Sequence, residues 1–326
     1  MSGNNTDNSR SLIRRDIFSQ IIIDELYDGF LPEGITRDVS DFPDGTTLYI
    51  PTFGEAVVQD VVEDQETPTS AIDTGRIVLE IDQHIGSGVD FTDELMEDAY
   101  YVQALESAAP GKMLHAVKEV YETRMLETGE RGQLQGDPNT INDYHHRFVA
   151  SGPNGQLTLE DFAYAKAALK KANVPEQGMI CIIDPITELT LNNLTNLVNV
   201  SFNPRFEGIV ETGFAKNMQF IRNIFGFDVY MSNRLPRILN ETIDASGGVA
   251  APSGNATATN SYAVQFMSVA DDMVTPYMSA WRRQPNVEYY RDAPRRKDVY
   301  YLTARYGFAM QRPQALITTL VSAEQY

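Results

Sequence analysis

Residues 53–82 read FGEAVVQDVVEDQETPTSAIDTGRIVLEID, the pattern of two β-strands joined by a long polar turn. In the second half Ile77, Leu79 and Ile81 alternate with mostly polar residues, which is the two-residue period of a half-buried strand. A two-stranded hairpin on its own is marginally stable in water. This stretch therefore predicts an acidic hairpin that must lie against another surface.

The composition sets the broad class of protein. The chain has 326 residues, of which 42% are hydrophobic, enough for one large domain or two smaller ones with a true core. Cys181 is the only cysteine, so an internal disulfide is impossible and a reducing compartment is expected. The N-terminus lacks the apolar segment of a signal peptide, and no apolar run is long enough to span a membrane.

The charge is large and unevenly distributed. The formal net charge of −19 argues against nucleic-acid binding by the whole surface. Residues 37–106 contain 17 Asp or Glu against two Arg, whereas residues 276–312 contain eight Arg or Lys against three acids. Such runs are usually solvated faces. Alternatively, the two segments meet, within one chain or between chains.

Glycine and proline residues mark the segment boundaries in the first part of the chain. Residues 1–45 are expected to form an arm, with a short helix within 11–31. Residues 46–90 are expected to carry the hairpin, which Gly86 and Gly88 would end.

A long helix is expected next. Thr92 followed by two acids predicts one helix start, and Pro110, a residue suited to a first helical position, predicts a second. Gly129 would close this second helix. Its expected apolar stripe is Leu114, Val117, Tyr121 and Met125.

The remaining chain alternates helices and strands. Thr158 and Asp161 resemble a capping box that opens a helix, and GMICIID, residues 178–184, predicts a buried strand. Residues 245–261 are low in complexity and predict a flexible loop. Strands are expected again in 299–310 and 315–321. The mixture predicts an α+β fold, since strands and helices do not alternate as repeated βαβ units.

No catalytic, metal or cofactor site is expected. The histidines do not have chelating spacing, and the apolar setting of Cys181 favours a buried structural thiol over a nucleophile. Adjacent acids are expected by composition alone in so acidic a chain, and there is no phosphate-binding glycine loop. The sequence therefore predicts a protein that is not an enzyme. The four histidines considered are His84, His115, His145 and His146.

The order of these parts resembles the major capsid protein of tailed bacteriophages, with the Hong Kong 97-type fold, and looks closest to the short-tailed branch. The resemblance covers nearly the whole chain as a pattern. It rests on TLYIPTFGEAVVQD and IVLEIDQHIGSGVDFTDE in the hairpin, a spine helix near 110–128, LTLEDFAYAKAALKKANVP leading into MICIIDPITELTL, RNIFGFDVYMSNRLP, and YLTARYGFAMQRPQALITTL.

The resemblance implies a domain organisation and a function. Residues 91–150 would form a peripheral domain with the spine helix, 151–262 an axial domain, and 263–326 the return strands of the peripheral domain. Hexamers and pentamers of the chain would build an icosahedral shell around double-stranded DNA, assembled in the host bacterial cytoplasm. An encapsulin-like protein compartment and an acidic soluble enzyme are the alternatives.

Partners are also implied. They are other copies of the chain, a scaffolding protein, a portal and weakly contacted packaged DNA, with no membrane; a decoration protein is left open. About 45 residues precede the hairpin, and the start at Met1 predicts no processed assembly segment, so scaffolding would be a separate protein. The family member that named the fold links its subunits through a hairpin lysine, whereas residues 46–90 contain no lysine here.

The hairpin is expected to dock on an adjacent subunit instead of on its own core. Its expected contact residues are Asp60, Glu63, Asp64, Glu66, Ile77 and Leu79. Their expected basic partners are Arg282, Arg283, Arg295, Arg296 and Lys297, or Arg14 and Arg15 of an arm. Gly86 and Gly88 are expected hinges that let the hairpin flex between non-equivalent positions.

Overall fold

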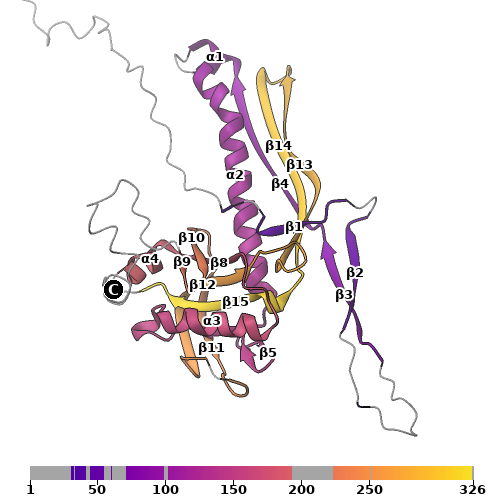
Figure 1. The fold of residues 1–326 in the computed structure, drawn as a ribbon. Coiled ribbons are helices and arrows are strands. Elements are labelled where there is room, and N and C mark those ends of the chain that lie inside the picture. The colour runs from indigo at the N-terminus through magenta and orange to yellow at the C-terminus, as the bar shows by residue number, and fades with distance from the viewer. Residues whose placement is uncertain are drawn as a thin grey trace, which may run out of the picture.

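Two sheets organise the chain in the computed structural model, which describes residues 31–32, 34–41, 45–54, 60, 71–98, 102–192, 223–249 and 251–324. The long sheet has the order β1-β13-β14-β4, and a seven-stranded sheet, the compact sheet, lies at one end of it (Figure 1). The strands of the long sheet are β1 (Thr36–Asp38), β13 (Tyr277–Asp292), β14 (Lys297–Met310) and β4 (Gln83–Thr92).

The compact sheet has the order β7-β15-β12-β8-β10-β9, with β11 also paired to β12. Its strands are β7 (Arg147–Val149), β15 (Leu316–Ser322), β12 (Ala256–Ser268), β8 (Met179–Ile183), β10 (Phe227–Met231), β9 (Asn223–Ile224) and β11 (Arg237–Ile243). Smaller elements are α1 (Asp93–Asp98), the pair β5 (Thr140–Ile141) and β6 (Tyr144–His145), and short 3-10 turns at Pro153–Gly155 and Pro313–Ala315.

Helix α2 (Val102–Arg131) runs along the long sheet and reaches the compact sheet with its last turns (Figure 1). Met113 and Val117 pack on Leu302, Ala304 and Tyr306 of β14. Strand β14 presents these side chains because they alternate along the strand and therefore point to the same face of the sheet. The expected helical stripe is displaced by one residue at its start, since Met113 is buried and Leu114 is exposed.

The bounds of α2 also differ from the prediction. The helix begins at Val102 and passes through Pro110, although an interior proline removes one helical hydrogen bond. Contacts on the same turn compensate, because Ala109 packs with Phe91 and Glu106 accepts a hydrogen bond from Tyr300 Oη at 2.6 Å. Gly129 lies inside the helix, not at its end.

Both faces of the compact sheet are covered, which explains why every residue of β8 is buried. Helix α3 (Leu159–Lys171) packs Phe162 and Leu169 on one face, and Leu126 of α2 packs on the other. The predicted capping box of α3 is confirmed, with the Thr158 N–H donating to Asp161 Oδ2 at 2.9 Å. Helix α4 (Pro185–Asn192) follows β8 directly.

The C-terminal strands divide between the two sheets differently from the expected domains. Residues 263–326 were expected to return to the peripheral domain, but β15 and all of β12 belong to the compact sheet, while β13 and β14 belong to the long sheet. Strand β12 also begins at Ala256, inside the expected loop 245–261. Polar, small residues can form a strand here because β11 pairs with them from Ala256 to Tyr262.

The hairpin consists of β2 (Thr47–Phe53) and β3 (Thr74–Glu80), paired antiparallel with Ile50 opposite Ile77. It projects from the side of the long sheet (Figure 1). Its inner face packs on Met278, Ala280 and Ala309 of β13 and β14. The expectation that the hairpin rests only on an adjacent subunit is therefore wrong at its base, because its own chain provides the apolar surface there.

Candidate assembly surfaces

The hairpin leaves an outward face without cover among the described residues. Tyr49 and Val78 are paired directly across the strands on this face, and Pro51 and Phe53 follow along β2. Phe53 is 76% exposed and Tyr49 is 57% exposed. The Arg76 guanidinium lies 5.1 Å from the centre of the Tyr49 ring, a cation–π contact that holds the ring in place.

The structure places the expected apolar contacts on the opposite face. Leu79 is completely buried within its own chain, and Ile77 is partly buried in the same cluster, so Leu79 cannot contact a neighbour. Neighbouring side chains of a strand point to opposite faces, so Val78, and not Leu79, lies on the outward face of the hairpin. Asp60 is exposed, and five further expected contacts lie outside the described residues: Glu63, Asp64, Glu66, Arg14 and Arg15.

Gly86 and Gly88 do not end the hairpin. Both lie inside β4, paired in register with Thr303 and Tyr301 of β14. A Cβ atom on Gly88 would lie 2.8 Å from the Tyr301 ring, so the glycine makes room for this ring, which stacks on Tyr290. The paired part of the hairpin ends at Glu80, and the hinge positions expected from the sequence are thus misplaced.

Acidic and basic segments meet within the chain at the far end of the long sheet. Lys297 pairs with Asp90, and Arg291 pairs with Asp93 at 2.6 Å and with Asp298 at 3.2 Å. The hydrogen bond from Lys297 lowers the pKa of Asp90, and that from Arg291 lowers the pKa of Asp93. The interpretation that the acidic and basic segments meet is therefore confirmed here, within one chain.

The other expected basic partners are exposed and only partly engaged. Arg283 forms an ion pair with Glu288, and Arg295 lies 3.5 Å from Asp292. Arg282 and Arg296 are also exposed, near the middle and at the tip of the β13–β14 pair.

A buried cluster of charges joins α2 to the compact sheet. Arg147 of β7 is fully buried and donates to Glu241 of β11 at 2.6 and 2.7 Å and to Glu130 of α2 at 3.0 Å. Burial raises the pKa of Glu241, but hydrogen bonds from Arg147 and the Gly136 N–H outweigh it and leave the pKa lowered. No local pattern in the sequence indicates this cluster.

A second buried pair ties the arm to the same helix. Glu122 accepts hydrogen bonds from Ser232 Oγ at 2.7 Å and from the Leu31 N–H at 3.2 Å, and Arg234 lies 3.4 Å away. Together, these two charge clusters fix the C-terminal half of α2 against three other parts of the chain.

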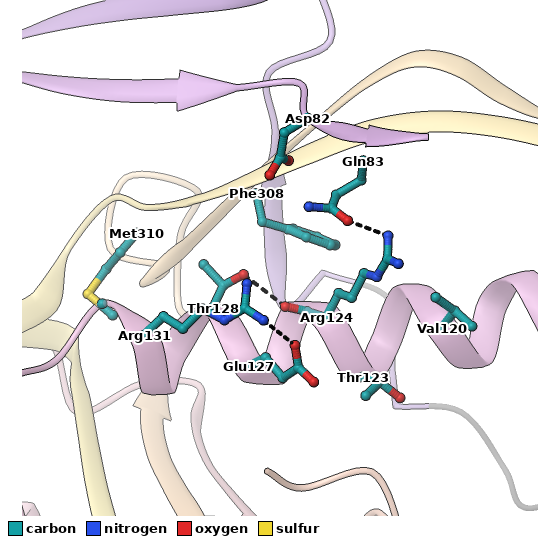
Figure 2. Close-up of a pocket in the computed structure, with 11 residues that line it drawn as sticks. Asp82, Gln83, Val120, Thr123, Arg124, Glu127, Thr128, Arg131, Phe308 and Met310 are labelled. Atoms are coloured by element: carbon teal, nitrogen blue, oxygen red, sulfur yellow. Dashed lines mark hydrogen bonds and ion pairs between the residues drawn. The ribbon is translucent and has the colours of Figure 1, made fainter. Parts of the chain in front are cut away.

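A groove of about 760 Å³ lies between α2 and the root of the hairpin. In Figure 2, Arg124 reaches across it to Gln83, where a hydrogen bond joins the helix to the start of β4. Arg131 pairs with Glu127 at 2.9 Å on the same helix. Because these charges contact the groove's own walls, the geometry indicates a junction between elements.

Three of the remaining candidate groups, Cys181, His145 and His146, are buried. Burial raises the pKa of the Cys181 thiol well above its ordinary value and lowers the pKa of His146. His145 is buried, with Nε2 2.7 Å from the Gly247 carbonyl oxygen. In the part of the chain that the structure describes, no three His, Cys, Asp or Glu residues are grouped to hold a metal, and no helix is both long and apolar enough to cross a membrane.

Solved structures with this arrangement include phage capsids. A chain from Mycobacterium phage Che8 is 15% identical, with 98% of each chain covered and a TM-score of 0.63. The capsid of cyanophage P-SCSP1u gives 16% identity, 94% and 92% coverage and a TM-score of 0.66. The mature capsid of bacteriophage PhiM1 gives 14% identity, 99% and 100% coverage and a TM-score of 0.63. No curated protein sequence matches the chain.

These likenesses define the class: the fold is the Hong Kong 97-type α+β fold of tailed-phage capsid proteins, as the resemblance implied. The phage capsid protein family matches residues 74–319, well over half of the chain. The chain belongs to the phage capsid protein family, and its function is that of a major capsid protein that forms the shell.

Proposed function

We propose that this chain forms hexamers and pentamers in an icosahedral shell around double-stranded DNA, and that neighbouring subunits are joined through the outward face of the hairpin. The family match over residues 74–319 is the observation that supports the first part. The chain acts as a structural subunit and not as an enzyme.

The outward face supports the second part. Tyr49, Phe53 and Val78 expose apolar surface on a projecting element, and such surface is unfavourable in water unless a partner covers it. Aromatic residues are typical of the centre of protein interfaces. Because the inner face already packs on its own chain, the hairpin is held in position and presents this patch to a neighbouring copy.

Charge contributes orientation. Asp60 and the acids that follow it in the sequence carry negative charge into the segment between β2 and β3. The exposed arginines at positions 282, 283, 295 and 296 of a neighbour are the proposed partners, although Arg283 and Arg295 also form ion pairs within their own chain. Exposed ion pairs contribute about 0–1 kcal/mol each. Their proposed role is therefore to set the orientation of neighbouring subunits more than to add affinity.

Other partners follow from this function. A separate scaffolding protein and a portal would take part in assembly in the host cytoplasm, and a decoration protein remains a candidate. An acidic subunit would contact packaged DNA weakly, since like charges repel.

The test is electron microscopy and gradient sedimentation of the chain expressed with the scaffold from the same phage. The variant Tyr49→Ser/Phe53→Ser should reduce the yield of shells at least several-fold while the thermal unfolding of the chain is unchanged. A matched control, Leu134→Ser/Leu239→Ser, removes two equally exposed apolar side chains elsewhere and should leave the yield unchanged. Normal shells from the hairpin variant would exclude the proposed contact, and a wild-type chain that never forms shells would exclude the function.

A further inference from the structure

Helix α2 has a second groove on the side opposite to that of Figure 2. This arm groove, of about 740 Å³, lies between α2 and β13. Its walls include Val117, Tyr121 and Met125 of the helix and Trp281 of β13, and its apolar surface exceeds its polar surface. Tyr121 and Trp281 stack at 4.7 Å between ring centres, and both remain partly exposed.

The described part of the arm forms one end of this groove. The Leu31 N–H donates to Glu122 of α2, and the chain then runs through Ile35 into β1, which pairs in parallel with β13. Leu31 is the first described residue, so the 30 residues before it leave the structure at the groove itself.

Those residues have a sequence suited to such a surface. Within residues 11–30, SLIRRDIFSQIIIDELYDGF, the apolar residues Phe18, Ile22 and Leu26 recur every four positions, with polar residues and two further isoleucines, Ile21 and Ile23, between them. Leu26 is five residues from Leu31, so it can lie at most about 18 Å from it. The groove is thus within reach of the apolar stripe of the same chain.

We infer that residues 11–30 cover the arm groove of their own chain, with the apolar stripe of Phe18, Ile22 and Leu26 packed toward Tyr121 and Trp281. The inference concerns the chain before assembly and does not depend on the proposed shell geometry. A neighbouring copy's arm is the competing occupant.

A disulfide test separates these possibilities, because Cys181 is buried and the chain has no other cysteine. Lys118 lies on the rim of the arm groove, and Val120, two residues further along α2, lines the groove of Figure 2. The two positions are equally close to Leu31 along the chain but face opposite sides of the helix. The double variant Leu26→Cys/Lys118→Cys is therefore matched by Leu26→Cys/Val120→Cys.

Under mild oxidation of the unassembled full-length chain, the Lys118 variant should form an intrachain disulfide at least fivefold faster than the Val120 variant. Equal rates, or no disulfide in either, would overturn the inference. A mixture of the two single variants, Leu26→Cys and Lys118→Cys, should stay monomeric. Efficient disulfide-linked dimers in that mixture would assign the groove to a neighbour's arm and overturn it as well.

Trp281 provides an independent readout, since it is the only tryptophan. Leu26→Asp should expose its ring, with a red-shifted emission and about twofold stronger quenching by acrylamide. Gln20→Asp adds the same charge on the polar side of the segment and should leave the emission unchanged. Identical spectra for both variants and the wild type would contradict the inference.

Discussion

Gly129 allows α2 to approach the two sheets more closely than any other residue would. A Cβ atom at this position would lie 1.9 Å from Tyr277 Oη and 3.0 Å from Gln265 Nε2. Neither neighbour can move easily, because Tyr277 is fully buried and donates to Gln265 Oε1 at 2.8 Å, while Gln265 Nε2 donates to the Leu126 carbonyl oxygen at 2.9 Å.

The variant Gly129→Ala should therefore lower the free energy of unfolding by about 1–3 kcal/mol, the usual cost of overpacking. Gly111, on the same helix, has no atom within 4 Å of the Cβ position. Gly111→Ala should raise the free energy of unfolding by about 0.5–1 kcal/mol, because alanine favours the helix. Denaturant unfolding of the unassembled chain measures both changes, and equal effects of the two substitutions would contradict this account.

Arg147 balances two buried carboxylates. Removing one partner of a buried ion pair costs about 3–5 kcal/mol, so Arg147→Met should destabilise the chain by this amount at pH 7. In the wild type the pKa of Glu241 is lowered, so its contribution to stability is present above its ordinary pKa of 4.5 and is lost as the pH falls through the folded value.

In the variant, burial without the arginine should instead raise the pKa of Glu241. The deficit of Arg147→Met relative to wild type should therefore shrink as the pH is lowered from 7 toward 4.5. Arg131→Met is the matched control, because Arg131 pairs with Glu127 at the surface. It should cost at most about 1 kcal/mol. A pH-independent deficit for Arg147→Met in denaturant unfolding would refute the proposed charge balance.

Local signals in the sequence predicted the residues whose partners are close along the chain. Thr158 and Asp161 form the capping box that their spacing indicated, and the apolar run around Cys181 is the buried strand β8. Arg147 gave no such signal, because its partner Glu241 is 94 residues away and the arginine follows two histidines in a polar stretch of sequence. Pairing of this kind depends on how β7 and β11 are brought together by the fold.

The root of the hairpin crosses β14 at Gly307. A Cβ atom on Gly307 would lie 2.0 Å from the Glu80 carbonyl oxygen and 2.9 Å from Ile81 Cα. These are backbone atoms, so a larger residue must displace the whole end of β3. The glycine thus determines how closely Leu79 and Ile81 pack on the long sheet.

Gly307→Ala should loosen the hairpin and speed hydrogen exchange of the β3 amides, residues 74–80, at least tenfold, while β8 amides keep their protection. Gly88→Ala serves as the control. Its nearest neighbour is the ring of Tyr301, which is exposed and can turn away, so β3 exchange should not change. Unaltered β3 exchange in Gly307→Ala would show that the crossing does not hold the hairpin.

The period of a strand predicted which residues share a face of the hairpin but not what each face contacts. Ile77, Leu79 and Ile81 alternate with exposed residues, as expected, yet their partners Met278 and Ala309 lie some 200 residues later and could not be inferred from the hairpin itself. The extension of α2 before Pro110 was missed for a related reason, since tertiary contacts there outweigh the local signal of proline.

The two sheets differ in how they are covered by the rest of the chain. The compact sheet is buried on both faces and closed by α3 and α2, whereas the long sheet carries α2 on one face and the projecting hairpin at its side (Figure 1). Among the described residues, acidic and basic side chains from the two oppositely charged segments pair within the chain on this second part, as Arg291 does with Asp93 and Lys297 with Asp90. Assembly contacts are therefore expected to draw on the arginines and apolar residues that remain exposed.

Subunits of this shell should not be linked covalently through the hairpin. An isopeptide bond needs a deprotonated lysine amine as nucleophile, an amide to attack and a carboxylate to take the proton. Residues 46–90 contain no lysine, and the first lysine of the chain is Lys112 on α2. Arg76 of β3 cannot replace it, because a guanidinium stays protonated and is not a nucleophile.

Disulfide linkage is expected to be absent too, because Cys181 is buried in the compact sheet, where a second subunit cannot reach it. Stability between subunits should instead come from buried surface, including Tyr49 and Phe53 of the hairpin. Mature particles boiled in detergent and denaturant should then release a single band near the chain mass of 36.4 kDa. A ladder of multimers that persists with reducing agent would show that a lysine outside the hairpin performs the linkage and that buried surface alone does not hold the shell.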